Sequence, residues 1–384
     1  MRVAFLTTDN REAFRDYARP EPIFGHAPTA LLQGFAAMPE VELHIVACLK
    51  QPVNSPEKIA PNIFYHSCVV PKFGWMRTGY QGCIRAARKK LREISPDIVH
   101  GQGTERDCGI SAALGGFPNV LTIHGNMKAV AQAFQARPGS FHWLAAHLET
   151  FALKRAVGVF CNSAYTEKMV APRAQKTWRV PNALRLDFFA PPPPKIISAR
   201  PVLLNVGSVL PYKQQVELLA VARKLHARGL PFELQFAGDR VADSEYGARF
   251  AHDLALAERA GYARHLGTLS APQLVAAMDA ADAFVHFPTE EAFGLVVAEA
   301  LARNLKFFGA TTGGVVDIVE DVADAELFSA ADFGGLENAL ARWLASNCPA
   351  RRDSAALMRA RYHPETVIRR HLEIYREVLA ARQA

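Results

Sequence analysis

Long hydrophobic runs are missing from this sequence of 384 residues. No apolar stretch reaches the roughly 18–20 residues that a helix needs to cross a bilayer, so a membrane-spanning protein is not expected. The N-terminal run MRVAFLTTDN is also shorter than a signal-peptide core and is typical of a first β-strand. We therefore expect a cytoplasmic protein, and association with the inner face of a membrane stays open.

Paired cysteines are missing as well. The six cysteines stand at 48, 68, 83, 108, 161 and 348, and none of them forms a CxxC pair. In a chain of this length such scatter indicates reduced, mostly buried thiols rather than a disulfide framework or a zinc site.

Composition sets wide limits on function. Half of the residues are hydrophobic and 21% are charged, which is ordinary for a globular enzyme, and the length suits two domains. The net charge of +7 favours polyanionic partners such as nucleotides, phosphorylated substrates or acidic lipid surfaces. A slightly basic protein without such a partner explains the same number equally well.

Short apolar runs alternate with longer stretches of helical periodicity in the first half of the chain. The apolar runs are continuous, which is typical of strands buried on both faces of a parallel sheet that helices cover. The expected strands are 3–8, 42–49, 97–101, 119–125 and 157–163, and the expected helices are 27–38, 78–93, 104–114 and 141–156.

Four consecutive prolines, at 191–194, interrupt this series. Proline neither continues a helix nor donates a hydrogen bond within a sheet, so residues 190–201 are expected to form a stiff linker. The alternation then restarts, with further strands and helices expected at 202–208, 213–229, 232–239, 245–260, 283–288 and 306–310.

The pattern predicts an α/β protein with two doubly wound, Rossmann-like parallel-sheet domains that face a central cleft. The N-terminal domain is expected at 1–190 and the C-terminal domain at 200–363. The last segment, 364–384, carries an amphipathic helix that suits packing back on the N-terminal domain.

Two carboxylates, Glu291 and Glu299, flank an almost wholly apolar run in TEEAFGLVVAEAL. The run follows a predicted strand, so a helix is expected to begin just after Glu291, with Glu299 about two turns inside. At about 1.5 Å rise per residue the two acids are too far apart to share a proton. Free amides at such a helix N-terminus suit an anion, and Gly294 lets a phosphate approach the main chain. The segment therefore indicates an extended ligand with polyol groups on both sides of a phosphate.

With this segment the sequence resembles the retaining GT-B glycosyltransferases, and in particular glycosyltransferase family 4 (group 1), whose signature is E-x7-E. The resemblance implies that Glu291 lies at the transferred sugar and that Glu299 bonds the ribose hydroxyls. It also implies that the main-chain amides of Phe293, Gly294 and Leu295 meet the diphosphate of a nucleotide sugar.

Other segments resemble the same family over nearly the whole chain. NVGSVLPYKQQ is similar to the strand–loop–helix in which an Arg and a Lys grip the diphosphate. Lys213 matches the Lys, whereas Ser208 stands where the Arg is usual. HLGTLSAPQ places Leu269 near the base pocket, and IFGHAPTA resembles a phosphate-capping loop with Gly25 as the contact.

The resemblance also assigns residues in the first domain. LTIHGN ends a predicted strand with His124, at a place where the family carries a histidine at the reacting sugar, so His124 joins Glu291 as a catalytic candidate. GQGTERDCG is a near miss for the dinucleotide fingerprint because Arg106 occupies the third glycine position. We interpret it as a substrate-side loop that meets the acceptor through Glu105 or Arg106.

The resemblance implies a hexosyltransferase-type enzyme. It would move a sugar from a nucleoside-diphosphate sugar, UDP- or GDP-linked, to a hydroxyl acceptor such as a cell-surface glycan or a lipid-linked saccharide, with retention of configuration. No cofactor or nucleic-acid partner is expected. No two aspartates are separated by a single residue, so the divalent-metal clamp of the other main transferase fold is not expected, and no metal ligands are predicted.

Three other functions stay open. One is a nucleotide-sugar epimerase or phosphorylase on the same fold. Another is an NAD-dependent oxidoreductase that uses the GQGTER loop. The third is a nucleotide-sugar-binding protein that has lost catalysis, for which the serine at position 208 is an argument.

The segment YQGCIRAARKKLREISPD is a predicted helix crowded with basic side chains, and KFGWMRTGY precedes it with aromatic residues that are expected to be exposed. The basic residues are Arg85, Arg88, Lys89, Lys90 and Arg92. A basic amphipathic helix can lie on acidic lipid, so residues 75–92 are a candidate for peripheral membrane contact. A solvated helix face explains the pattern too.

Overall fold

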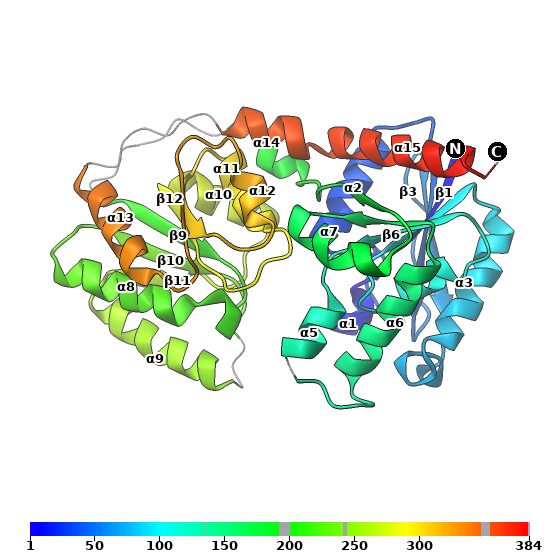
Figure 1. The fold of residues 1–384 in the computed structure, drawn as a ribbon, viewed down its shortest axis with the longest axis horizontal. Helices are drawn as coiled ribbons and strands as arrows, with labels where there is room; N and C mark the ends of the chain where they lie inside the picture. Colours follow the sequence, from blue (N-terminus) through cyan, green and yellow to red (C-terminus); the bar gives the residue numbers. More distant parts are fainter. Residues whose placement is uncertain (134, 192–199, 241–243, 347–353, 383–384) are drawn as a thin grey trace. The chain divides into compact units, whose positions relative to one another are not determined.

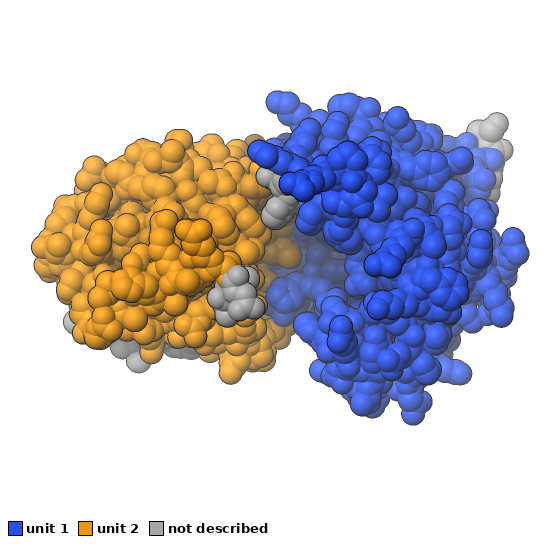
Figure 2. Space-filling model, turned by 90° about the horizontal axis from the view of Figure 1, so that it is seen from below, with its two compact units in different colours: residues 1–185, 362–384 blue, residues 186–361 orange. Residues whose placement is uncertain are grey.

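The computed structural model describes residues 1–133, 135–191, 200–240, 244–346 and 354–382. The chain divides into two compact units, which Figure 2 colours separately: unit 1 comprises residues 1–185 and 362–384, and unit 2 comprises residues 186–361. The predicted linker at 190–201 lies largely outside the described residues.

Unit 1 is built on one sheet. Its described strands follow the order β3-β4-β2-β1-β5-β6-β7-β8, and every neighbouring pair is parallel except β3 with β4. The strands are β1 (Arg2–Leu6), β2 (Glu42–Leu49), β3 (Lys58–Ala60), β4 (Ile63–Val69), β5 (Ile98–Gln102), β6 (Asn119–Ile123), β7 (Gly158–Cys161) and β8 (Thr177–Arg179). The helices are α1 (Arg11–Phe14), α2 (His26–Ala36), α3 (Gln81–Ile94), α4 (Asp107–Ala113), α5 (Met127–Ala133), α6 (Phe141–Arg155), α7 (Ala164–Val170) and α15 (Pro364–Ala380).

Both faces of this sheet are buried, as its continuous apolar strands predict. Val3 and Phe5 of β1 pack in one hydrophobic cluster with residues of α2 and α15, whereas Ala4 and Leu6 pack in another with residues of α3 and α4. Figure 1 shows the ribbon of these strands and helices. The C-terminal helix α15 thus belongs to unit 1, where Tyr375 contributes its ring to the first cluster.

Unit 2 repeats the architecture with a fully parallel sheet of described strands in the order β11-β10-β9-β12-β13-β14. The strands are β9 (Val202–Val206), β10 (Glu233–Ala237), β11 (Ala263–His265), β12 (Ala283–His286), β13 (Lys306–Ala310) and β14 (Ala325–Phe328). The helices are α8 (Gln215–Ala227), α9 (Glu245–Arg259), α10 (Ala271–Ala280), α11 (Leu295–Ala302), α12 (Val315–Val319), α13 (Phe333–Ala345) and α14 (Ala355–Tyr362). The predicted α/β class with two Rossmann-like parallel-sheet domains is confirmed.

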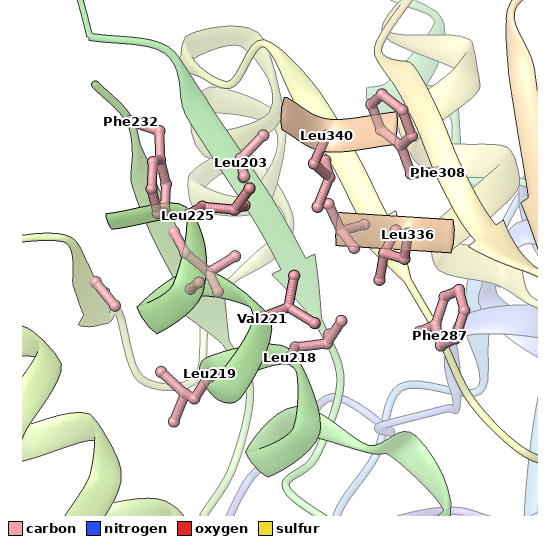
Figure 3. Close-up of a cluster of buried hydrophobic side chains, with 14 of the residues drawn as sticks. Leu203, Leu218, Leu219, Val221, Leu225, Phe232, Phe287, Phe308, Leu336 and Leu340 are labelled. Carbon is pink, nitrogen blue, oxygen red and sulfur yellow. The ribbon is translucent and has the colours of Figure 1, made fainter. Parts of the chain in front are cut away.

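The core of unit 2 shows why α8 forms where it does. Leu218 and Leu225 recur at helical spacing and point with Val221 into a buried cluster against Leu203 of β9 and Leu336 of α13 (Figure 3). A single apolar stripe therefore fixes which face of α8 meets the sheet.

The structure bears on two further predictions from the sequence, one about membrane-spanning helices and one about the cysteines. No helix among the described residues is long and apolar enough to span a bilayer. The five described cysteines, at 48, 68, 83, 108 and 161, are buried free thiols, as predicted, and Cys348 lies outside the described residues.

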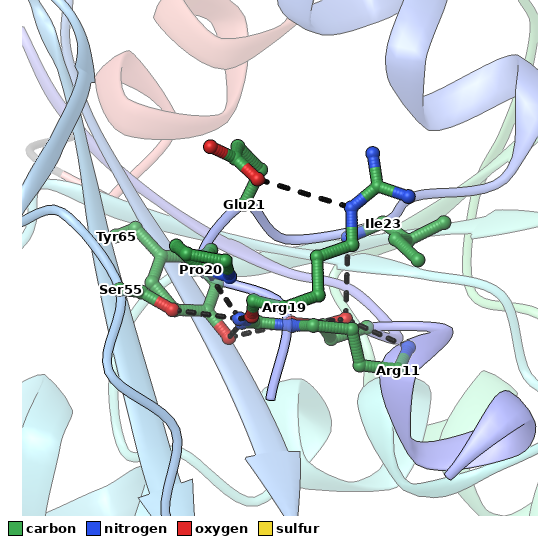
Figure 4. A network of polar contacts seen from close by, with 8 residues as sticks. Arg11, Arg19, Pro20, Glu21, Ile23, Ser55 and Tyr65 are labelled. Carbon is green, nitrogen blue, oxygen red and sulfur yellow. Dashed lines mark hydrogen bonds and ion pairs between the residues drawn. The ribbon is translucent and has the colours of Figure 1, made fainter. Parts of the chain in front are cut away.

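A buried ion pair organises the loop between β1 and α2. The side chains of Asp9 and Arg11 are 0% exposed, and Arg11 Nη2 lies 2.7 Å from Asp9 Oδ2. Arg11 Nη1 donates hydrogen bonds of 2.8 and 2.9 Å to the main-chain oxygens of Arg19 and Pro20 (Figure 4). The guanidinium therefore folds the loop back over its own start.

Strand β4 completes this network. The hydroxyl of Tyr65 donates to Asp9 Oδ2 at 2.7 Å and accepts from Arg11 Nη2 at 3.1 Å. Burial, together with the negative charge of Asp9, raises the pKa of Tyr65 above its ordinary value. A buried charge is tolerated only with such complete pairing, so the loop depends on all three side chains.

We expect Arg11→Met to destabilise the full chain by about 3–5 kcal/mol, because Asp9 stays buried without its cation. Urea unfolding followed by circular dichroism measures the change. Arg19→Ala is the matched control, since that side chain is half-exposed and its weak ion pair with Glu21 spans 3.9 Å. The double variant Asp9→Asn/Arg11→Met should recover part of the loss. Equal midpoints for Arg11→Met and Arg19→Ala would contradict this role.

Candidate functional site

A cluster of charged side chains in unit 2 lies where β12 ends. Glu291 stands in the loop between β12 and α11, and its Oε2 accepts hydrogen bonds from Lys213 Nζ at 2.6 Å and from His286 Nε2 at 3.0 Å. Glu291 and Lys213 are mostly buried, and His286 is 2% exposed. Loops after parallel strands meet at the carboxyl edge of a sheet, which is where ligands bind in open α/β sheets.

Electrostatics keep this carboxylate ionised. Burial alone would raise the pKa of Glu291, but the hydrogen bond from His286 and the charge of Lys213 outweigh it and lower the pKa from 4.5 to about 2. The interaction therefore stabilises the fold above pH 4.5 and is lost as the pH falls through about 2. Burial lowers the pKa of His286, so its ring is neutral near pH 7.

The loop that carries Glu291 rests on the loop after β13. The carbonyl oxygen of Glu291 accepts a hydrogen bond of 3.1 Å from the amide of Gly314, and Thr312 Oγ1 donates to the carbonyl oxygen of Pro288 at 3.0 Å. Gly313 has a positive φ of 51°, and a Cβ there would lie 1.7 Å from the same Glu291 oxygen. The position of Glu291 is thus set by main-chain contacts.

Helix α11 begins two residues later than the sequence predicts, at Leu295 rather than at Phe293. Gly294 is its N-cap, with φ of 97°, and Leu295 is its first residue, so Phe293 precedes the helix and is buried. Glu299 lies about one turn inside, not two as predicted, and is 2% exposed. The first amides of any helix have no acceptor within the helix, so the amides of Gly294 and Leu295 suit an anion. They follow Glu291 closely in the sequence.

The remaining predicted donor residues of unit 2 follow neighbouring strands. Ser208 is exposed in the loop after β9, where its carbonyl oxygen accepts a hydrogen bond of 2.9 Å from Gln215 Nε2. Leu269 is half-buried in the loop between β11 and α10. Because β9 pairs with β12, the Ser208 loop neighbours the loop of Glu291, whereas β11 lies at the sheet's edge.

In unit 1, the loops after β5 and β6 are joined by polar contacts. His124 Nε2 lies 3.1 Å from Gln102 Oε1, and Glu105 Oε1 accepts a hydrogen bond of 2.7 Å from the amide of Gly125. Burial lowers the pKa of His124, and the charge of Glu105 acts in the opposite direction. Two of the predicted residues, His124 and Glu105, are therefore brought to one place.

Arg106 and Gly25 take different positions in unit 1. Arg106 is the N-cap residue of α4, and its guanidinium carbon lies 5.4 Å from the centroid of the Trp75 ring. Gly25 is the N-cap of α2 with an ordinary φ of −64°, and a Cβ there would meet only Pro28, at 3.7 Å. Nothing in the local backbone requires glycine at position 25.

One group of potential metal ligands occurs among the described residues: Cys48, Cys83 and Asp107, whose ligand atoms lie within 4.8 Å of one another. All three are buried. A hydrogen bond involving Cys83 and burial raise the pKa of Cys48 well above its ordinary value, so this thiol is protonated at neutral pH. The thiolate is the form of cysteine that binds a metal, so an ion at this group would have to displace the proton of Cys48.

Two family models match the chain in succession. Residues 29–188 match the model described as Glycosyltransferase Family 4, and residues 190–359 match the model described as Glycosyl transferases group 1. The chain belongs to the group 1, family 4 glycosyltransferases. No curated protein sequence matches this glycosyltransferase significantly.

Solved structures with the GT-B fold are similar to the glycosyltransferase over nearly its whole length. Sucrose-phosphate synthase from Thermosynechococcus elongatus is 19% identical with a TM-score of 0.76, covering 99% of this chain and 100% of its own. HepE from Anabaena, in complex with UDP and glucose, is 16% identical with a TM-score of 0.70, and the shares are 98% and 100%. The lipopolysaccharide outer core galactosyltransferase WaaB is 16% identical with a TM-score of 0.68 and the same shares.

Two buried residues of the glycosyltransferase were not predicted from sequence. His286 is the last residue of β12 and His124 directly follows β6, so a histidine at the end of an apolar strand run was a signal that could have found His286. Glu149 of α6 is fully buried and accepts hydrogen bonds from Thr104 Oγ1 at 2.8 Å, the amide of Met127 at 3.0 Å and Arg173 Nη1 at 2.8 Å. It ties the loops around His124 together, and no local pattern marks it.

We expect Gly313→Ala to destabilise the glycosyltransferase by about 1–3 kcal/mol more than Gly261→Ala, because only the first Cβ meets a neighbouring atom. Both glycines have positive φ, 51° and 77°, so the backbone strain is matched. Thermal unfolding measures the difference. Equal melting temperatures would show that the Glu291 loop moves aside at no cost.

Proposed function

We propose that this glycosyltransferase moves a hexosyl group from a UDP- or GDP-linked hexose to a hydroxyl acceptor, with retention of configuration and without a metal ion. A cell-surface glycan or a lipid-linked saccharide is the proposed acceptor. The contact of Lys213 with Glu291 at the carboxyl edge of the unit 2 sheet carries the proposal. HepE with bound UDP and glucose, and the lipopolysaccharide galactosyltransferase WaaB, lend support through the shared fold.

Lys213 is the proposed ligand of the diphosphate. An ammonium group has three N–H donors, and one of them goes to Glu291. The others remain for phosphate oxygens, and charge-assisted hydrogen bonds of this kind contribute roughly 1.5–3 kcal/mol. The amides of Phe293, Gly294 and Leu295 at the start of α11 would add fixed dipoles, while Ser208 supplies a hydroxyl in place of a second cation.

The two carboxylates of the signature take opposite ends of the donor in this proposal. Glu299 bonds the ribose hydroxyls, Leu269 lies near the base, and Glu291 bonds hydroxyls of the transferred sugar. Carboxylates accept hydrogen bonds from hydroxyls and repel phosphates, so this order keeps the diphosphate between them, on the N–H groups.

The proposed reaction breaks the bond between the anomeric carbon and the diphosphate oxygen while a bond to the acceptor oxygen forms on the same face. The acceptor proton passes to the departing phosphate oxygen, so no side chain need act as nucleophile. Lys213 and the first amides of α11 stabilise the negative charge that develops on the diphosphate. For unit 1 the proposal keeps the assignments that the family resemblance implies: His124 for the reacting sugar, Gly25 for the phosphates, and Glu105 or Arg106 for the acceptor.

A donor panel tests the function directly. Thermal-shift and product assays with UDP-, GDP- and ADP-hexoses and with NAD, each with and without EDTA, should show stabilisation and transfer by one hexose donor, unaffected by the chelator. Stabilisation by NAD alone would refute the proposal in favour of an oxidoreductase. Tight donor binding without transfer or slow hydrolysis would indicate an inactive binding protein.

Substitutions of Glu299 and Glu291 should change different quantities, nucleotide affinity and kcat respectively. We expect Glu299→Gln to weaken nucleotide affinity by about 10- to 100-fold, since hydrogen bonds to a charged group are lost. Glu291→Gln should instead lower kcat with nucleotide affinity nearly unchanged. Glu290→Gln, at the exposed neighbouring acid, is the control and should leave both near the wild-type values. Unaltered nucleotide affinity in Glu299→Gln would refute the ribose assignment.

We also propose that unit 1 contacts acidic membranes through residues 75–92 and the adjoining loop. Arg85, Arg88, Lys89 and Arg92 of α3 are exposed, opposite a buried face of Ile84 and Leu91. Of the aromatic residues before this helix, Phe73 is 75% exposed, whereas Trp75 and Tyr80 are buried, contrary to the expectation that they are exposed; Val69, at the end of β4, is 51% exposed. Basic side chains beside exposed apolar ones suit the surface of an anionic bilayer.

Sedimentation with vesicles tests this contact. Arg85→Gln/Lys89→Gln should reduce binding to phosphatidylglycerol vesicles by roughly tenfold or more at low salt, because each basic residue contributes about 1 kcal/mol. Arg369→Gln/Arg370→Gln, on exposed positions of α15, removes the same charge elsewhere and should have little effect. Equal losses of vesicle binding in the two double variants would show that binding depends on net charge and not on α3.

A further inference from the structure

His286 is a buried, titratable residue that lies outside the E-x7-E signature. It ends β12, it is 2% exposed, and its ring lies 6.0 Å from that of Phe284 at an angle of 21°. Strand pairing with Gly309 of β13 fixes its backbone. The imidazole is therefore held in one orientation before any ligand arrives.

The ring is directed at one particular oxygen. His286 Nε2 lies 3.0 Å from Oε2 of Glu291, and Lys213 Nζ lies 2.6 Å from the same atom. Within the described part of the chain, no donor is hydrogen-bonded to Oε1. Two donors thus hold the carboxylate by one oxygen and leave the other available.

If the proposed function holds, the contact of Lys213 with Glu291 weakens when the diphosphate binds. A bound diphosphate carries more negative charge than one carboxylate, so it competes for the ammonium group. A largely buried carboxylate that lost its cation would turn away or take up a proton unless another donor stayed. His286 is the donor that stays on Glu291, because its ring is buried and cannot turn toward the diphosphate.

We propose that His286 is a positioning residue: as a neutral imidazole it donates Nε2–H to Glu291 Oε2 throughout the reaction and presents Oε1 to a hydroxyl of the transferred sugar. This inference rests on the proposed function for the identity of the ligand. The charged groups that face the ring are Glu291 and Lys213. Burial and the charge of Lys213 lower the pKa of His286, while Glu291 opposes them, which agrees with a neutral ring.

Two substitutions separate positioning from packing. His286→Leu removes the donor and keeps an apolar side chain in the core, whereas His286→Gln keeps a donor at the corresponding reach. We expect His286→Leu to lower kcat by about 10- to 100-fold with the Kd for free nucleotide within twofold, and His286→Gln to restore most of the loss. The acidic limb of the kcat–pH profile should move upward in His286→Leu, because Glu291 loses a donor that lowers its pKa.

Phe284→Leu is the control for disturbance of β12, and it should leave the pH profile in place. Equal losses in the Leu and Gln variants, no loss in the Leu variant, or a loss confined to nucleotide affinity would each overturn the proposal.

A readout without turnover keeps the two proposals distinguishable. Nitrogen NMR of histidine-labelled protein, assigned with the His286→Gln variant, should show a neutral Nε2–H tautomer at pH 7. Carboxyl-carbon NMR should show a higher pKa for Glu291 in His286→Leu than in the wild type. An Nδ1–H tautomer, an imidazolium or an unchanged Glu291 pKa would refute the role of His286. Failure of all donors to bind would refute the proposed function instead.

Discussion

The constraint on which the unit 2 site depends is a largely buried carboxylate that stays ionised. Glu291 is removed from most of its water, and it remains charged because Lys213 and His286 both donate to Oε2. Each partner comes from a different strand end, after β9 and at the end of β12, so the sheet itself holds the three groups together. A carboxylate fixed in this way is prepared to accept hydroxyl protons without first paying to reorganise water.

The two parallel sheets follow from local sequence because strands buried on both faces are continuous apolar runs, such as AFVH and KFFGA. Strands with less burial were not predicted. β14 is only half-buried along its length, β11 has three residues, and β3 and β4 form a partly exposed antiparallel pair at the sheet's edge. Their apolar signal is weak, and pairing with an existing sheet edge rather than local preference makes them strands.

The site could be predicted only in part. Motif spacing located Glu291, Glu299 and Gly294, although α11 begins later than expected and Glu299 therefore lies one turn inside the helix. Contacts between distant segments were beyond reach: Lys213 and Glu291 are 78 positions apart, and Arg11 owes its burial to partners in other segments. The roles of these residues toward the sugar donor and the acceptor stay predictions.

A crystal structure with an unreactive analogue of the preferred donor tests the central claim most directly. It should place Lys213 Nζ on a diphosphate oxygen, Glu299 on the ribose, and Oε1 of Glu291 on a hydroxyl of the sugar while Oε2 keeps the hydrogen bond from His286. A diphosphate bound away from the carboxyl edge of the β9–β12 pair, or a Glu291 side chain turned away from both the sugar and His286, would contradict the account.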